Sequence, residues 1–173
     1  MCGRSFYEGY LVGEGVEKKT IASIGGLTAS LLIIAAVAAF GSQFAPDLWY
    51  AGIVKPSWTP PGWIFGPVWT LLYILMAVAA WLVWREREDR ASLPALVFYA
   101  AQMFVNALWS WIFFGLHRIG WALLDLSALW VLILITCLFF WRIRRAAAIL
   151  MLPYLAWVSF AGILNFALWR LNV

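Results

Sequence analysis

The sequence predicts an all-α membrane protein, a bundle of five transmembrane helices with a long first loop rich in proline and tryptophan. Of its 173 residues, 65% are hydrophobic and only 12% are charged, and the mean hydropathy is +0.89. Soluble domains are roughly 45–50% apolar and about 25% charged. A chain of this length cannot bury so large an apolar fraction in one core, so we expect lipid to surround it.

Five apolar runs are long enough to cross a bilayer as helices, because a span needs about 20 residues at a rise of about 1.5 Å each. We place these runs at residues 21–44, 63–84, 93–113, 119–141 and 147–170. Residues such as 126–140 do not alternate apolar with polar side chains, which argues against the strands of a β-barrel. Helices also close their own backbone hydrogen bonds, as a segment in lipid must.

The chain before the first span is an N-terminal extension, residues 1–20, and residues 21–173 form the transmembrane domain. The extension holds three acidic and three basic residues. It lacks the basic start, apolar centre and small-residue cleavage site of a signal peptide, so we do not expect it to be one.

The first loop, residues 45–62, is long and has a composition of its own. Its second half carries Pro56, Pro60 and Pro61. Each proline fixes φ and restricts the residue before it. This part should therefore be a stiff segment that holds Trp58 and Trp63 in place, as a lid over one end of the bundle.

Basic residues gather on one side of the predicted bundle. Nine of the twelve lie at the N-terminus and in the second and fourth loops, namely Arg4, Lys18, Lys19, Arg85, Arg87, Arg90, Arg142, Arg144 and Arg145. By the positive-inside rule that side, with the N-terminus, is cytoplasmic, while Lys55, Arg118 and Arg170 lie on the other. The net charge of +4 thus reflects topology in a bacterial membrane, or in an organelle outer membrane if the source is eukaryotic. We expect no nucleic-acid partner.

Thirteen tryptophans are present, and most fall near predicted helix ends, where the membrane interface favours their amphipathic rings. Three lie deeper, because Trp69, Trp130 and Trp157 are six, eleven and ten residues inside their spans. At the rise of an α-helix this is roughly 9 to 16 Å from the helix end. A buried indole N–H needs a hydrogen-bond partner, so these three residues are candidates for a role inside the bundle.

Polar and aromatic residues also share single faces of three spans. These faces consist of Trp69 and Tyr73, of Gln102, Asn106 and Trp109, and of Trp157, Ala161 and Asn165. Amide side chains between membrane helices can act as interhelical hydrogen bonds, each worth roughly 0.6 kcal/mol. The same faces can line an apolar pocket with a few polar contacts, the usual composition of a small-molecule site. The residues alone leave both interpretations open.

Ionisable groups inside the spans are few. Asp125 is the only acid well inside a span, and we expect it to snorkel or to pair with Arg118 or a tryptophan N–H. No second acid, lysine or histidine accompanies it there, so general acid–base catalysis lacks a pair. The single histidine, His117, and the two distant cysteines, Cys2 and Cys137, predict no metal site.

Several stretches resemble the translocator protein family, also called TspO/MBR or tryptophan-rich sensory proteins, across residues 21–173. They are Trp49-Tyr50 and residues 55–76, 99–115, 120–126 and 153–172. The resemblance implies a five-helix bundle whose pocket binds tetrapyrroles such as protoporphyrin IX and haem, in some members sterols, and isoquinoline-carboxamide or benzodiazepine drugs. It also implies a receptor or sensor linked to tetrapyrrole metabolism or stress signalling, with no required cofactor.

The family's ligand-binding positions match aromatic, amide and small residues of this chain. They are Tyr50, Trp58, Trp63, Trp69, Asn106, Trp109, Trp121, Trp157 and Ala161. We add Tyr73 and Asn165, which share helix faces with members of this set. Some family members degrade porphyrin in light with the positions that match Trp69 and Trp157 implicated, so these two are the candidate catalytic residues if that activity is present.

Alternatives to a receptor stay open. A porphyrin or sterol transporter would normally show broken helices or internal repeats, and five spans give no evident repeat. Light-dependent porphyrin degradation is the second alternative, and the sequence does not decide whether the protein is an enzyme. Sterol is less favoured, because the last span has Phe166 where the family usually has tyrosine. A homodimer is also open, although Val97 lies where a small residue would allow close helix approach beside Ala101.

Overall fold

The computed structural model describes residues 4–44 and 46–173, with the backbone alone for residues 4–22. Its long helices are α1 (Arg4–Ser42), α3 (Phe65–Arg85), α4 (Ser92–Ser110), α5 (Ile119–Ile143) and α6 (Arg145–Leu171). The short elements are the helix α2 (Leu48–Gly52), the 3-10 turn η1 (Gly62–Ile64) and the π-helical turn η2 (Trp111–Gly115). The predicted all-α fold is confirmed.

Five helical segments are long and apolar enough to cross a membrane, as the sequence predicted. They are Ser23–Ser42, Gly62–Arg85, Ser92–Gly115, Ile119–Ile143 and Arg145–Leu171. α1 is longer than its span, because the helix begins at Arg4 within the predicted N-terminal extension. The side chains of the extension lie outside the described residues.

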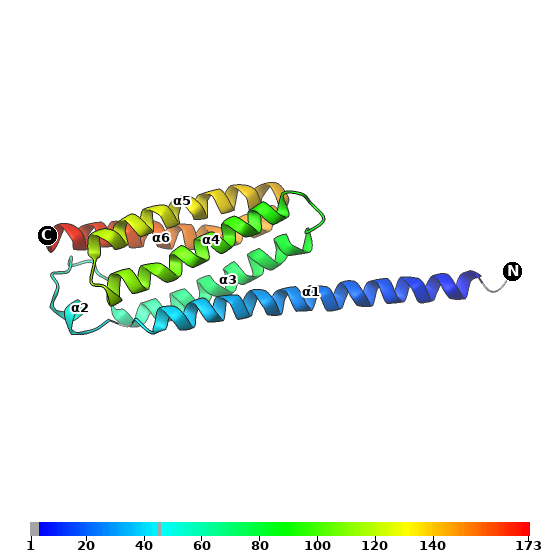
Figure 1. Ribbon diagram of the computed structural model, residues 1–173, viewed down its shortest axis with the longest axis horizontal. Coiled ribbons are helices and arrows are strands. Elements are labelled where there is room, and N and C mark those ends of the chain that lie inside the picture. Colours follow the sequence, from blue (N-terminus) through cyan, green and yellow to red (C-terminus); the bar gives the residue numbers. More distant parts are fainter. Residues whose placement is uncertain (1–3, 45) are drawn as a thin grey trace.

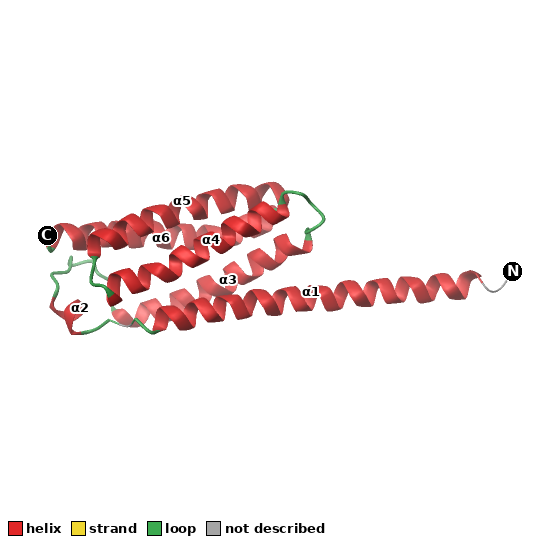
Figure 2. Cartoon of the chain, in the orientation of Figure 1, coloured by secondary structure: helices red, strands yellow, loops and turns green. Residues whose placement is uncertain are grey.

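The long helices alternate in direction and lie side by side (Figure 1). α5 packs against α4 and α6, α3 packs against α6, and α1 lies along α3 with a smaller contact to α4. The connections lie at the two ends of the bundle (Figure 2). We call the end with the α3–α4 and α5–α6 connections the basic end. The opposite end, with residues 43–64, the α4–α5 connection and the C-terminus, is the loop end.

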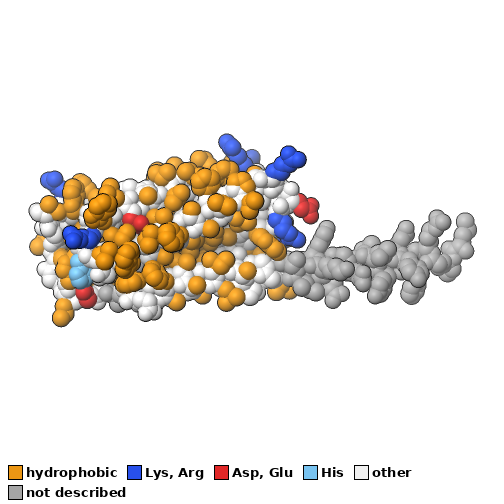
Figure 3. Space-filling model, in the orientation of Figure 1, with side chains coloured by type: hydrophobic (Ala, Val, Ile, Leu, Met, Phe, Trp, Pro, Cys, Tyr) orange, Lys and Arg blue, Asp and Glu red, His pale blue; other side chains and the backbone are white. Residues whose placement is uncertain are grey.

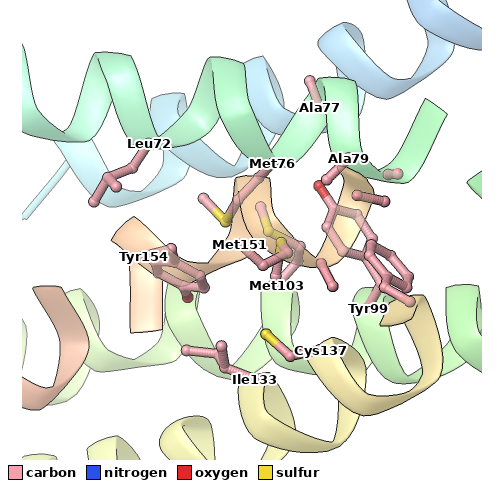
Figure 4. Close-up of a cluster of buried hydrophobic side chains, with 14 of the residues drawn as sticks. Leu72, Met76, Ala77, Ala79, Tyr99, Met103, Ile133, Cys137, Met151 and Tyr154 are labelled. Atoms are coloured by element: carbon pink, nitrogen blue, oxygen red, sulfur yellow. The ribbon is translucent and has the colours of Figure 1, made fainter. Parts of the chain in front are cut away.

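The core lies between α3, α4, α5 and α6. Met76, Ile133, Met151 and Tyr154 are fully buried there, and Figure 4 shows them converging from different helices. Small residues let the helices approach closely, as is usual in membranes. The buried alanines are Ala77, Ala79, Ala80, Ala95, Ala122, Ala147 and Ala148.

Large apolar side chains cover the outside of the bundle, and charges gather mainly at its ends (Figure 3). At the basic end, Arg144 Nη1 donates to Glu86 Oε1 at 2.8 Å, which joins the α5–α6 connection to the end of α3. The Arg85 guanidinium lies 5.0 Å from the Trp81 ring centroid. Aromatic and arginine side chains in contact are typical of a membrane–water interface.

Candidate functional site

An aromatic cavity of about 550 Å³ opens near the loop end, between the first loop and the helices α3, α4 and α6. The helices contribute Phe65 and Trp69 from α3, Trp109 and Ser110 from α4, and Trp157, Phe160, Ala161, Leu164, Asn165 and Leu168 from α6. The turn η2 adds Phe113 and Phe114, and the loop adds Pro46, Tyr50, Lys55, Thr59, Pro60 and Gly62. This volume is within the range of small-molecule sites, about 300–1,000 Å³.

The aromatic walls are built from rings that pack on one another. Trp157 makes edge-on contact with Phe65 at a centroid distance of 5.7 Å and a tilted contact with Phe160 at 5.6 Å. On the other wall, Trp109 stacks on Phe113 at 5.1 Å. Such ring pairs hold each other's orientation, so the walls are largely formed before any ligand arrives.

The turn η2 explains how two consecutive phenylalanines reach this cavity. Its hydrogen bonds run from the Leu116 N–H to the Trp111 carbonyl at 2.9 Å, one residue further back than in an α-helix. The wider turn changes the direction of the following side chains. As a result both Phe113 and Phe114 line the cavity, and their rings meet at 4.8 Å.

Two contacts fasten the first loop to the rest of the loop end. Val54 N–H donates to Asn172 Oδ1 and Asn172 Nδ2 donates to the Val54 carbonyl, each at 2.9 Å. His117 Nε2 lies 3.1 Å from Asp47 Oδ2, and the His117 ring stacks on Trp49 at 4.3 Å. We call these two contacts the clasp. His117 adopts a φ of 55°, uncommon for a residue with a side chain, in the turn that brings it to the loop.

Asp47 also begins α2, the short helix that carries Tyr50 into the cavity wall. Its Oδ1 accepts the Tyr50 backbone N–H at 3.0 Å, which is an N-cap contact. That hydrogen bond, and secondarily the nearby His117, holds the pKa of the Asp47 carboxyl below its usual value. Burial raises the pKa of the Tyr50 phenol, which stays neutral at physiological pH.

Polar groups are few in the cavity but well placed. Trp109 Nε1 and both amide atoms of Asn165 are buried and have no hydrogen-bond partner among the described residues. Lys55 Nζ donates to the carbonyls of Ala51 and Ile53, at 3.2 and 3.1 Å, and lies 4.7 Å from the Tyr50 ring centroid. The cavity thus offers a buried indole donor, a buried amide and one cation.

A small void of about 40 Å³ lies next to the cavity and shares Trp69, Trp109, Trp157 and Ala161 with it. Asn106 borders this void and accepts a hydrogen bond from the Tyr73 hydroxyl at 3.2 Å. The Tyr73 ring in turn contacts Trp69 at a centroid distance of 5.2 Å. Tyr73 and Asn106 therefore support the cavity wall from behind.

The sequence-predicted residues divide into four groups by position. Those that line the cavity are Tyr50, Trp69, Trp109, Trp157, Ala161 and Asn165. Tyr73 and Asn106 support the cavity wall from behind. Trp58 packs edge-on against the cavity residue Phe160 at a centroid distance of 6.0 Å. Trp63 and Trp121 border neither space; their exposed fractions are 75% and 66%. Trp63 stands on the turn η1, and Trp121 borders a surface hollow beside Arg118.

Several cavity residues that the sequence did not predict lie one helical turn from predicted ones. Phe65 precedes Trp69 by four residues, and Leu164 and Leu168 continue the face of Trp157 and Ala161. Extending each face by one turn would have found them. The position of Lys55 could not be predicted from helical spacing, because only the fold of the loop brings this residue to the cavity.

The remaining intramembrane polar residues lie elsewhere. Trp130 Nε1 donates to Ser159 Oγ of α6 at 2.9 Å. This hydrogen bond supplies the partner that we expected for an indole N–H so far inside its span. Asp125 Oδ2 is buried, and among the described residues it has neither the expected Arg118 nor a tryptophan N–H as partner. Within the same part of the chain, His, Cys, Asp and Glu side chains form no group of three that could hold a metal ion.

The amino-acid sequence is similar to those of known proteins. The TspO/MBR family profile matches residues 28–170. Protein CrtK of Rhodobacter capsulatus is 43% identical over 139 residues, which cover 80% of this chain and 87% of that protein. The tryptophan-rich protein TspO of Chlorobaculum tepidum is 42% identical over 144 residues, 79% of this chain and 89% of that protein. Human translocator protein is 42% identical over 127 residues, 72% and 75% of the two chains.

Proposed function

Since the chain belongs to the TspO/MBR family, we propose that it is a membrane receptor that binds a tetrapyrrole, such as protoporphyrin IX or haem, in the aromatic cavity. One observation carries the proposal. A cavity walled by Trp69, Trp109 and Trp157 combines flat aromatic surfaces with a lining cation and with buried polar atoms that have no hydrogen-bond partner among the described residues. A large planar ligand that bears carboxylates complements all three features.

Lys55 supplies the positive charge of the cavity. Its ammonium uses two of its three N–H groups on the carbonyls of Ala51 and Ile53. The third N–H and the positive charge are available to a carboxylate. A propionate of a tetrapyrrole would meet this group while the macrocycle lies between the indoles.

Trp109 and Asn165 offer hydrogen-bonding groups to a ligand in the cavity. Leaving a donor or acceptor buried without a partner costs about 1–3 kcal/mol. In the part of the chain that the structure describes, neither the indole N–H of Trp109 nor the amide of Asn165 has a partner. A ligand with acceptor and donor atoms would satisfy them. The apolar remainder of the wall would contact the body of the ligand. A Cereibacter sphaeroides relative at 41% identity is named tryptophan-rich sensory protein, and this name is consistent with a binding role.

The test is a titration of the purified protein in lipid, in the dark, followed by tryptophan fluorescence. The two ligands are protoporphyrin IX and its dimethyl ester, which lacks the free carboxylates. We expect saturation near one porphyrin per chain. Lys55→Gln should weaken binding of the free acid about fivefold to tenfold and leave the ester unchanged, because a charge-assisted hydrogen bond contributes more than a neutral one.

The control variant is Trp141→Phe, at the opposite end of α5 from the cavity, which should change neither titration. Quenching that never saturates, and that is the same in the native chain and in Trp157→Phe, would mean that porphyrin only dissolves in the lipid. That outcome would overturn the proposal.

A light-dependent reaction of bound porphyrin is a second candidate function. It is favoured by the position of Trp69 and Trp157, which border the same cavity. An indole against a photoexcited macrocycle can donate an electron to it. Under illumination with oxygen, Trp69→Phe and Trp157→Phe should each slow loss of porphyrin absorbance at equal occupancy. Equal rates in the native chain and both variants would refute this role.

A further inference from the structure

A second hollow lies on the outside of the bundle, between α1, α3 and α4, and shares no residue with the aromatic cavity. Its volume is about 850 Å³. Small residues form much of its wall, among them Gly25, Ala29, Ser30, Ala36, Ala100 and Ala107. We call this hollow the α1 groove.

The α1 groove has the length of a lipid chain. It follows α1 from Gly25 to Phe40, a distance of about 22 Å at 1.5 Å per residue. The hydrocarbon core of a bilayer is about 30 Å thick, so one leaflet measures about 15 Å. Ile33 and Phe104, which border the groove, are 57% and 65% exposed on the outside of the bundle. The groove can therefore accept one whole acyl chain from the surrounding membrane.

At the basic end, the α1 groove ends at the Trp84 ring, and the Arg87 guanidinium lies over this ring. The Trp84 ring packs on Gly26 so closely that a Cβ on Gly26 would lie 2.4 Å from the ring. The Arg87 guanidinium lies 4.4 Å from the centroid of the Trp84 ring. Arg87 is exposed and forms no ion pair with the side chains that the structure describes.

The neighbouring acidic side chains that the structure describes do not form an ion pair with Arg87. Glu86 is held by Arg144 at 2.8 Å, and Asp89 Oδ1 accepts the backbone N–H of Ala91 at 2.8 Å. Glu88 is exposed. Among the side chains that the structure describes, Arg87 is the cation that lies on the Trp84 ring, where an anion at the groove mouth would meet it.

Tyr99 adds one polar group to the wall. The residue is 7% exposed, lines the α1 groove, and its hydroxyl has no hydrogen-bond partner among the described residues. Figure 4 shows the ring reaching from α4 with its hydroxyl turned toward α3. A buried hydroxyl is costly without a partner, so an occupant with acceptor oxygens fits better than pure hydrocarbon.

We propose that the α1 groove binds one anionic phospholipid, with an acyl chain along α1 and its phosphate at Arg87. Basic groups beside clefts between transmembrane helices are a recognised arrangement for acidic lipid headgroups. A second copy of the chain fits less well as the occupant. A symmetric dimer across this face would bring two copies of Arg87 to the same end of the interface, and like charges repel.

The test compares phosphatidylglycerol with phosphatidylcholine of identical acyl chains, by native mass spectrometry of the full chain released from detergent. We expect one phosphatidylglycerol to be retained per chain, about fivefold more than phosphatidylcholine, since one arginine near the headgroup supplies about that preference. Arg87→Gln should abolish the difference between the lipids. Arg142→Gln is the matched control, because this exposed arginine lies at the same end on α5, away from the groove.

A third variant tests the acyl chain. Gly25→Leu adds a side chain where a Cβ meets nothing within 4 Å, so it should fill the α1 groove without disturbing the helices. It should lower retention of both lipids, while the dark porphyrin titration of every variant stays native, which shows that the bundle is folded.

Three results would overturn the proposal. Equal retention of the two lipids by the native chain would remove headgroup recognition. An equal loss in Arg142→Gln and Arg87→Gln would show only general attraction to the basic end. A dimer that carries no lipid and dissociates in Gly25→Leu would assign the groove to a second copy.

Discussion

Two neighbouring glycines of α1 should respond to the same substitution with opposite signs. Gly26→Ala places a methyl group 2.4 Å from two carbon atoms of the Trp84 ring, whereas Gly25→Ala places it in open space. Overpacking of a formed contact costs about 1–3 kcal/mol, and alanine in a helix is favoured over glycine by about 0.5–1 kcal/mol. We therefore expect Gly25→Ala to stabilise the fold by about 0.5–1 kcal/mol and Gly26→Ala to destabilise it by about 1–2 kcal/mol.

The assay is the thermal unfolding midpoint of each purified variant in one detergent and at one lipid content. A change of 1 kcal/mol shifts Tm by about 2–4 °C in a domain of this size. Gly25→Ala should raise Tm by about 1–4 °C, and Gly26→Ala should lower it by about 2–8 °C. The double variant Gly26→Ala/Trp84→Leu should recover part of the loss, because the ring that meets the new methyl is removed. A Tm change of the same sign in both single variants would refute this account of how α1 packs on α3.

Further predictions concern the loop end. Asn172→Ala removes both hydrogen bonds to Val54, and hydrogen exchange in residues 48–56 should become faster; unchanged exchange would show that the bonds do not hold the loop. The lowered pKa of Asp47 favours its charged form in the fold, so its contribution to stability is complete above about pH 4 and is lost as the pH falls through the lowered value. Trp49 fluorescence should change over that acidic range, and Asp47→Asn should remove this acidic change. Trp109→Phe should weaken porphyrin binding while Trp121→Phe should not, and the reverse order would show that the ligand lies nearer Trp121 than the cavity does.

The transmembrane spans could be predicted from the sequence because their signal is local. Each is an apolar run that ends in charged or aromatic residues, and the observed segments, such as Ile119–Ile143, differ from the predicted ones by two residues or fewer. The extent of α1 could not be predicted in this way. Charged and polar residues before residue 21 continue the same helix beyond the apolar run, where hydropathy gives no indication of helical structure.

The cavity could be predicted only in part. Helical spacing correctly grouped Trp157, Ala161 and Asn165 on one face, because α6 is regular there. It could not bring Phe113 and Phe114 to the cavity, since the π-helical turn breaks the period of 3.6 residues on which the reasoning depends. The place of Lys55 is set by backbone carbonyls of a non-helical loop, which no periodicity describes.

The clasp separates how fast a ligand exchanges from how tightly it is held. Its residues Asp47, Val54, His117 and Asn172 do not line the cavity, so a ligand in the cavity need not touch them. For a ligand that passes through the loop end, these contacts raise the free-energy barrier to both association and dissociation. They do not change the difference in free energy between the bound and the unbound state. Loosening the clasp therefore accelerates association and dissociation by one common factor, and the residence time of a ligand becomes a property of the loop rather than of the walls that bind it.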